Sequence, residues 1–289
     1  MTHRPAFRFH NKEQTKGDKC LSHANAKHRG EGEMTDFNLN ADMAEGYGPW
    51  RMGDDDGLLQ IISSANIACG FHAGDYQIMG SVMKSADSHG VSIGAHPSFY
   101  DLHGFGRRQM SLSDVEIERL IAYQLGASLG VAAAEQVRVT HIKPHGAINN
   151  MACADANLSA AIVRAVKAVA PDIIMLAPVL SELLAESEKA GLPVAAEVFA
   201  DRAYMPDGQL VPRSRSDAMI HDPEDSLRHC LRMFGDGEIQ AVDGCRLKVA
   251  AQSVCVHGDG PAALVTARHI KKGLQAAGFQ IKTLPQMIS

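Results

Sequence analysis

The sequence predicts an α/β barrel, in which short parallel strands alternate with helices. From Asp36 onward, brief apolar runs alternate with amphipathic stretches, a pattern typical of repeated βα units and a parallel sheet. The length of 289 residues lies in the range of single α/β barrels. A doubly wound open sheet is the alternative, but no phosphate-binding GxGxxG motif follows the first strand. We therefore favour the barrel.

About seven strands are predicted, each a short run of small, apolar or β-branched residues. The side chains of chemical interest stand in the polar or glycine-containing breaks after these runs. The runs lie near Phe37–Leu39, Ala65–Cys69, Val91–Gly94, Thr140–Ile142, Ile173–Leu176, Val194–Val198 and Ser253–Val256.

Capping residues and apolar spacing predict the helices between these strands. Ser113, with Glu116 three residues later, forms a capping box that opens a helix over Asp114–Leu129, with Gly130 at its end. Two further helices carry similar start and stop signals. Their markers are Leu158, Ile162, Val166 and Val169 at helical spacing before Pro171, and Pro261 and Gly278 around the final helix.

The chain divides into a polar start and a single domain. Residues 1–33 contain almost no aliphatic side chains, so we expect a disordered N-terminal extension. Met34 directly precedes the first strand, so a misassigned translation start is the alternative. Because no repeat or linker divides the rest, residues 34–289 are predicted to form a single catalytic βα-barrel domain.

Composition excludes several classes of partner. The net charge of -5 gives no basic surface for nucleic acid, and no apolar run is long enough to span a membrane. The six cysteines form no CxxC pair, which favours buried thiols over disulfides or a zinc ribbon. The N-terminus has no apolar signal region, so we expect a cytoplasmic protein.

Polar side chains follow six of the seven predicted strands. In a parallel barrel the residues just past each strand converge on one rim, where active sites of this fold are built. A lone histidine is more often structural than functional, but several on one rim reverse that expectation. The residues are Asn40, Asp42 and Glu45; His72 and Asp75; His96; Lys143 and His145; Glu197 and Arg202; and His257 and Asp259.

Two kinds of chemistry fit these residues. Imidazoles and carboxylates can hold a zinc-like or manganese-like divalent metal that activates water. A carboxylate and a lysine can instead move protons without a metal. The sequence leaves both open; the candidate metal ligands are Asp42, His72, His96, His145 and His257.

Cationic residues near the same rim indicate an anionic substrate. Lys143 stands at a strand end, where a partly buried ammonium needs a carboxylate or an oxyanion as partner. Arg107 and Arg202 stand in loops over the rim, and arginine matches the geometry of carboxylates and phosphates. A substrate carboxylate or a phosphorylated intermediate fits them, with solvated loop arginines as the alternative.

Six motifs identify the family that this chain resembles. They are NLNADMAEGYG (38–48), SSANIACGFHAGD (63–75), GAHPSFYDLHGFGRR (94–108), IKPHGA (142–147), EVFADRAYMPDGQLVPRS (197–214) and VCVHGD (254–259). Together they resemble the LamB/YcsF family, the A-type subunits of ATP-hydrolysing 5-oxoprolinase. The family pattern usually contains IDLNCDLGE and KPHGALYN, so here Asn38 stands for an acid and Asn149 for a tyrosine.

The resemblance implies a fold and a reaction. The fold is a distorted, seven-stranded (β/α) TIM-like barrel of the glycoside hydrolase and deacetylase type. The enzyme is a hydrolase of cyclic amide C–N bonds, which converts the lactam 5-oxo-L-proline (pyroglutamate) and water to L-glutamate with ATP. Two partner subunits, of the B and C type, are implied, and a homo-oligomer stays open. Because the chain has no GxxxxGK[ST] loop, we expect ATP binding in the partner subunits.

Roles follow for the rim residues. We expect Asp42, His72, Lys143 and His145 to be catalytic, with Lys143, Arg107 and Arg202 holding anionic groups. The alternatives are a stand-alone metal-dependent deacetylase or amidohydrolase, and a non-catalytic substrate-binding subunit. The residues expected to bind substrate are Asn40, Glu45, Asp75, His96, Arg107, Glu197, Arg202, His257 and Asp259.

Overall fold

The computed structural model describes residues 35–257 and 263–288. The predicted disordered extension, residues 1–33, lies outside the described residues, and so do Asp259 and Pro261. None of the described helices is long and apolar enough to cross a membrane. The cytoplasmic location stays a prediction.

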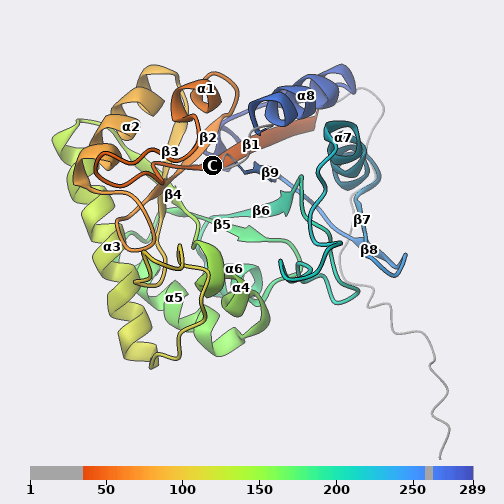
Figure 1. Ribbon diagram of the computed structural model, residues 1–289. Helices are drawn as coiled ribbons and strands as arrows, with labels where there is room; N and C mark the ends of the chain where they lie inside the picture. The colour runs from red at the N-terminus through yellow and green to blue at the C-terminus, as the bar shows by residue number, and fades with distance from the viewer. Residues whose placement is uncertain (1–34, 258–262, 289) are drawn as a thin grey trace, which may run out of the picture.

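Seven parallel strands close into a barrel (Figure 1). Each strand pairs with the next, and the last pairs with the first. The predicted seven-stranded barrel is thereby confirmed, and the open sheet is wrong. In order the strands are β1 (Thr35–Met43), β2 (Ser64–Ala68), β3 (Ser92–His96), β4 (Val139–Ile142), β5 (Ile174–Pro178), β6 (Val194–Phe199) and β9 (Ser253–Val256).

The first strand distorts the ring because it is long enough to take two partners in succession. Its first three residues, from Thr35 to Phe37, pair with β10 (Phe279–Ile281), and residues 38–41 pair with β9. β9 therefore joins β1 only after β10 has ended. The barrel closes through a strand that is nine residues long, against four to six for the other six.

Alternation along β1 places polar groups inside the barrel. Successive side chains of a strand point to opposite faces, and here Asn38, Asn40 and Asp42 alternate with apolar residues. Asn38 donates to Ser63 and Ser64, and its Oδ1 accepts from Ser253. The buried amides are thus satisfied by neighbouring strands, which keeps a polar barrel interior from being destabilising.

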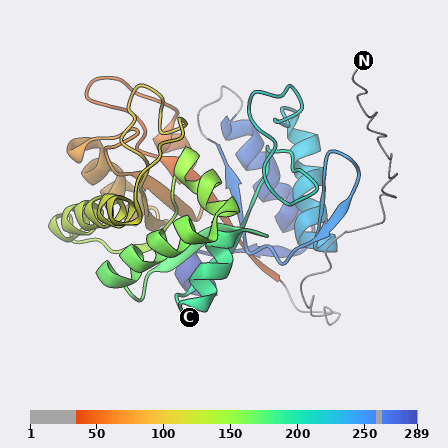
Figure 2. The same ribbon diagram turned by 90° about the horizontal axis from the view of Figure 1, so that it is seen from below.

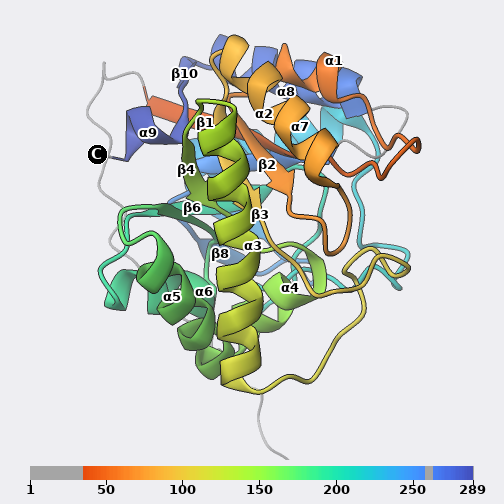
Figure 3. The same ribbon diagram turned by 90° about the vertical axis from the view of Figure 1, so that its left-hand side faces the viewer.

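Helices cover the outside of the barrel (Figures 1 and 3). The longest, α3, lies beside α5 and also contacts α2. Their apolar faces pack against the strands, where Ile121, Leu125 and Ile162 are fully buried. The helices are α1 (Asp55–Leu59), α2 (Tyr76–Ser88), α3 (Asp114–Ala134), α4 (Gly146–Ala154), α5 (Ala156–Val169), α6 (Glu182–Lys189), α7 (Pro223–Leu231), α8 (Ala263–Ala276) and α9 (Leu284–Met287).

The predicted capping box is confirmed, whereas the predicted end of that helix is wrong. Ser113 and Glu116 bond reciprocally at the start of α3. The helix runs through Gly130 to Ala134, because an exposed glycine weakens a helix without ending it. The helix with spaced apolar residues before Pro171 is confirmed as α5.

The segment between β6 and β9 was not predicted in detail. It contains α7, a π-helix (Arg232–Asp236), and the antiparallel hairpin of β7 (Glu238–Gln240) and β8 (Arg246–Lys248). Such three-residue strands carry too little periodicity to be recognised from sequence. In Figure 2 the loops after β1, β3 and β6 lie along the upper edge of the molecule.

Candidate functional site

Lys143 occupies the interior of the barrel, directly after β4. Its side chain is 2% exposed, and its Nζ lies 3.1 Å from Asp42 Oδ1 and 2.9 Å from Glu197 Oε1. Cys255 Sγ lies 3.1 Å from the same nitrogen. Burial opposes the charged ammonium, but Asp42 and the other partners outweigh it and hold the pKa of Lys143 well above its usual value. The lysine is thus a fixed cation.

Three histidines and one glutamate converge beside this lysine. One ligand atom from each of Glu45, His72, His96 and His145 lies within 4.8 Å of the others. Glu45 Oε1 is 3.1 Å from His72 Nε2 and 3.6 Å from His145 Nδ1. The rings of His72 and His145 are stacked, with their centroids 3.8 Å apart. Such a set of imidazole and carboxylate ligands suits a zinc-like ion. We call it the histidine cluster.

Backbone carbonyls determine which nitrogens of the cluster carry lone pairs. His96 Nδ1 lies 2.6 Å from the carbonyl oxygen of Lys143, and His145 Nε2 lies 3.0 Å from that of Phe105. A carbonyl only accepts, so both of these nitrogens donate. The opposite nitrogens, His96 Nε2 and His145 Nδ1, face each other at 3.0 Å. Two neutral imidazoles cannot bond there, and a cation between them would satisfy both.

Burial disfavours a proton on His145 and on His72. It lowers the pKa of His145 well below its usual value, and the neighbouring His72 and His96 lower it further. The pKa of His72 is also well below its usual value, first because the ring is buried. Neutral imidazoles are the form that binds a metal. The donor set and the facing lone pairs therefore fit a divalent metal.

Asp42 lies between the histidine cluster and Lys143. Its Oδ2 is 3.2 Å from His96 Nε2, and its Oδ1 accepts from Asn66 at 2.9 Å. Burial favours the neutral acid, but His96 and Lys143 outweigh burial and hold the pKa of Asp42 well below its usual value. Asp42 is thus an ionised carboxylate at the cavity surface.

His257, after β9, pairs with Asp201, after β6. Its Nδ1 lies 2.8 and 2.9 Å from the two oxygens of Asp201, and its Nε2 lies 3.3 Å from Arg213 Nη2. Burial lowers the pKa of His257, but Asp201 outweighs burial, so the net direction is upward. The site therefore contains histidines with lowered pKa and one with raised pKa.

The candidate metal ligands from the sequence do not form one cluster. Glu45 joins three of them, whereas Asp42 and His257 lie close to Cys255 in a second group. The sequence did not single out Glu45 as a ligand, nor Asp201 and Cys255 for any role. Asp201 directly precedes Arg202 after a predicted strand. That strand-end position could have identified Asp201 as a site residue.

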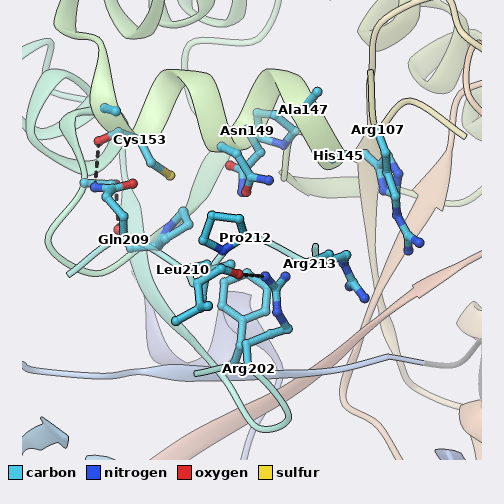
Figure 4. Close-up of a pocket in the computed structure, with 18 of the residues that line it drawn as sticks. Arg107, His145, Ala147, Asn149, Cys153, Arg202, Gln209, Leu210, Pro212 and Arg213 are labelled. Atoms are coloured by element: carbon cyan, nitrogen blue, oxygen red, sulfur yellow. Dashed lines mark hydrogen bonds between the residues drawn. The ribbon is translucent and has the colours of Figure 1, made fainter. Parts of the chain in front are cut away.

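A cavity of about 490 Å³ opens above these residues (Figure 4). Asp42, Glu45, His96 and His145 line one end of it, and Arg107, Arg202 and Arg213 also line it. Arg202 is held by the carbonyls of Val211 and Ala218. Burial and the nearby Arg213 lower its pKa to about 10. An anionic group in the cavity would relieve this crowding of positive charge.

Asn40, Asp75 and Glu197 are not among the residues that line the cavity. Asn40 donates to Glu197 inside the barrel. Asp75 is the N-cap of α2, where it accepts from the backbone of Gly48, Gln77 and Ile78. Asp75 thus positions the loop after β1 and is not among the cavity-lining residues.

Comparisons with known proteins agree on one group. The model of the LamB/YcsF family matches residues 37–289. The chain is 52% identical over 254 residues to the A-type subunit of 5-oxoprolinase from Azoarcus sp. (strain BH72), covering 88% of this chain and 99% of that protein. Identity to the protein of the same name from Rhodopseudomonas palustris (strain ATCC BAA-98 / CGA009) is 48%, over 85% and 97% of the two chains.

A solved structure matches as well. The lactam utilization protein from Thermus thermophilus superposes with a TM-score of 0.81 at 40% identity. The match covers 86% of this chain and all of that one. Fold and sequence therefore point to the same set of relatives.

Proposed function

Because this chain belongs to the LamB/YcsF family, we propose that it is the lactam-opening subunit of an ATP-dependent 5-oxoprolinase. Its substrate is 5-oxo-L-proline and its product L-glutamate. Residues 34–289 act as one catalytic domain. One observation carries the proposal: a cluster of three buried histidines and a glutamate stands beside an arginine-lined cavity. That arrangement suits hydrolysis of a small anionic amide.

Glu45, His72, His96 and His145 would hold a divalent metal. When bound, the metal would act as a Lewis acid toward the activated substrate. The carbonyls of Lys143 and Phe105 hold the rings of His96 and His145 from behind, which leaves His96 Nε2 and His145 Nδ1 as the nitrogens that would bind the metal.

The chain's own residues handle the substrate and the protons. Arg202 and its neighbours Arg107 and Arg213 hold the substrate carboxylate in the cavity. Asp42, kept ionised by Lys143 and His96, takes one proton from the attacking water.

The ring then opens at the bond between the carbonyl carbon and nitrogen. The nitrogen leaves with a proton from His257 Nε2, from which Arg213 turns away when it binds the substrate carboxylate, while Asp201 orients the ring through Nδ1. Two titratable groups whose surroundings move their pKa values apart are the usual arrangement for a base and an acid in one site.

ATP enters through the partner subunits. Amides are poor electrophiles, and a division of labour fits a chain without a nucleotide-binding loop. The partners would transfer the γ-phosphoryl group of ATP to the lactam oxygen and release ADP. A first water then adds to the activated carbon and the C–N bond breaks, which leaves an acyl phosphate. A second water attacks the same carbon, the phosphate leaves with the former lactam oxygen, and the γ-carboxylate of L-glutamate forms.

The test is reconstitution of the chain with its two partner subunits. The wild-type complex should form L-glutamate from 5-oxoproline only when ATP is present. His72→Ala and His145→Ala should each abolish turnover, because each removes one donor of the cluster and leaves the others unsupported. His89→Ala, at the exposed end of α2, is the matched control. Near-wild-type turnover in both cluster variants would sink the assignment.

A stand-alone metal-dependent amidohydrolase is the second candidate, and the histidine cluster favours it. In that case the isolated chain would hydrolyse an amide or an acetyl group without ATP, and chelation would stop it. A non-catalytic substrate-binding subunit would instead keep its ligand affinity in the His72 and His145 variants.

A further inference from the structure

Asn149 stands one helical turn beyond His145, on the side of α4 that lines the cavity. His145, the residue before α4, and Asn149, within it, line the same cavity. Figure 4 shows it between Ala147 above and Pro212 below, in the cavity that Arg202 also borders.

The carboxamide oxygen of Asn149 has no hydrogen-bond donor among the described residues. Its side chain is buried, with the residue 4% exposed, and its Oδ1 has no hydrogen-bond partner among the described residues. The other buried carboxamides in the described chain all make hydrogen bonds. These are Asn38, Asn40, Asn66 and Gln124.

None of the described residues that line the cavity donates to Asn149 Oδ1. Leu210 and Pro212 line the same cavity with apolar side chains. Gln209 donates to the carbonyl of Cys153, and Arg202 donates to the carbonyl of Val211. A buried acceptor without a donor is normally eliminated from a protein interior. One that lines a cavity is instead satisfied by what enters the cavity.

We propose that Asn149 selects the substrate by reading the amide edge of the lactam ring. This rests on the proposed function. The ring holds its amide in the cis form, so N–H and C=O lie side by side on one edge. The Asn149 carboxamide presents the complementary pair, an acceptor oxygen beside a donor NH₂. Both hydrogen bonds can form in one plane.

The complex should therefore distinguish the lactam from an analogue that differs only in one ring atom. An analogue with oxygen in place of the ring N–H keeps the shape, the carbonyl and the carboxylate, but leaves the Asn149 acceptor unpaired. Sites built to bind a substrate N–H reject analogues that lack it far more strongly than apolar pockets reject a missing methylene. Asn149 is therefore a specificity-determining residue, with no part in proton transfer.

The test uses the reconstituted complex and this isosteric lactone carboxylate. For wild type and Asn149→Leu we would measure KM for 5-oxoproline and the inhibition constant of the lactone in the same assay. The partner subunits are identical in both, so any change in the ratio belongs to this chain. The variant should raise KM for the lactam about tenfold or more, while the lactone constant rises by a clearly smaller factor, because the substitution removes two hydrogen bonds to the lactam and one to the lactone.

Further variants separate specificity from folding. Asn157→Leu, on the exposed face of α5, is the control for an added leucine. Asn149→Asp keeps an acceptor but loses the donor, and it should retain part of the preference for lactam over lactone. Thermal unfolding of each variant reports the fold separately.

Three outcomes overturn the inference. They are parallel weakening of lactam and lactone, an unchanged ratio in Asn149→Leu, and a wild-type complex that binds both equally well. If the wild-type complex does not open 5-oxoproline at all, the proposed function fails first, and the two failures are thereby distinguished.

Discussion

The buried charged residues of this barrel lie next to residues of opposite charge. Lys143 contacts Asp42 and Glu197, and His257 contacts Asp201. Each pair joins the ends of different strands. Removing one partner of a buried set leaves the charge of the other uncompensated, which costs more than the pair contributes when intact.

Substitution of Lys143 should test this directly. Lys143→Met leaves two buried carboxylates without their cation, so we expect a loss of about 3–5 kcal/mol in the free energy of unfolding. Lys189→Met, which breaks an exposed pair with Glu186, is the control and should cost less than about 1 kcal/mol. Urea unfolding at pH 7 measures both, and equal effects would contradict the role given to burial.

The pH dependence of turnover should report the pair of His257 and Asp201. The pKa of His257 is raised, so the imidazole keeps its proton to higher pH, and activity that needs this proton falls as pH rises through that pKa. Asp201→Asn removes the main stabilising charge. The alkaline limb of kcat/KM should then move to lower pH, by about one pH unit.

Asp172→Asn, at an exposed position before β5, serves as the control for that profile. If the alkaline limb of kcat/KM is at the same pH in Asp201→Asn as in wild type, His257 is not the proton donor.

At the scale of elements, close contacts between strands set the shape of the barrel interior. β3 and β4 pair with a shift in register between Ile93 and Gly94. A Cβ on Gly94 would meet the ring of His141 at 2.2 to 2.7 Å, well inside ordinary contact. Gly94 therefore leaves room for a buried histidine that bonds Asn66 on β2.

Gly94→Ala should accordingly loosen the pairing of β3 with β4. We expect a loss of about 1–3 kcal/mol in the free energy of unfolding, because the new methyl group overpacks the interior. Gly126→Ala in α3, where nothing lies within 4 Å, should be neutral or stabilising by about 0.5–1 kcal/mol. A stable Gly94→Ala variant would show that His141 can move.

At the scale of the whole molecule, the histidine cluster joins segments that follow three strands. Glu45 comes after β1, His72 after β2, and His145 after β4, with His96 at the end of β3 itself. A metal bound by all four would tie these segments together. Any ligand that binds only the folded state stabilises it, by about 4 kcal/mol at a concentration 1,000 times its Kd.

Metal removal should therefore affect stability as well as activity. After dialysis against a chelator, the midpoint of thermal unfolding should fall, and Zn²⁺ or Mn²⁺ should restore it. His96→Ala should abolish that response, whereas His269→Ala, exposed on α8, should keep it. If neither chelator nor metal changes the midpoint of thermal unfolding, the metal-free chemistry of Asp42 and Lys143 is favoured.

Sequence alone determined the features that depend on neighbours along the chain. The seven strands, the capping box of Ser113 and Glu116, and the helix before Pro171 all follow from local periodicity or from contacts three residues apart. The polar residues after the strands were also visible, because strand ends in a parallel barrel face one rim. For the same local reason the weak three-residue strands were missed.

Tertiary structure alone decided which of those polar residues meet. Glu45 reaches His72 across 27 positions, His257 reaches Asp201 across 56, and Asn38 reaches Ser253 across 215. The tautomers of His96 and His145 depend on carbonyls brought close by folding. Hydrogen bonds extend about 3 Å in space whatever the separation in sequence. Periodicity therefore predicts the barrel, while the partners within its site exist only once the barrel has closed.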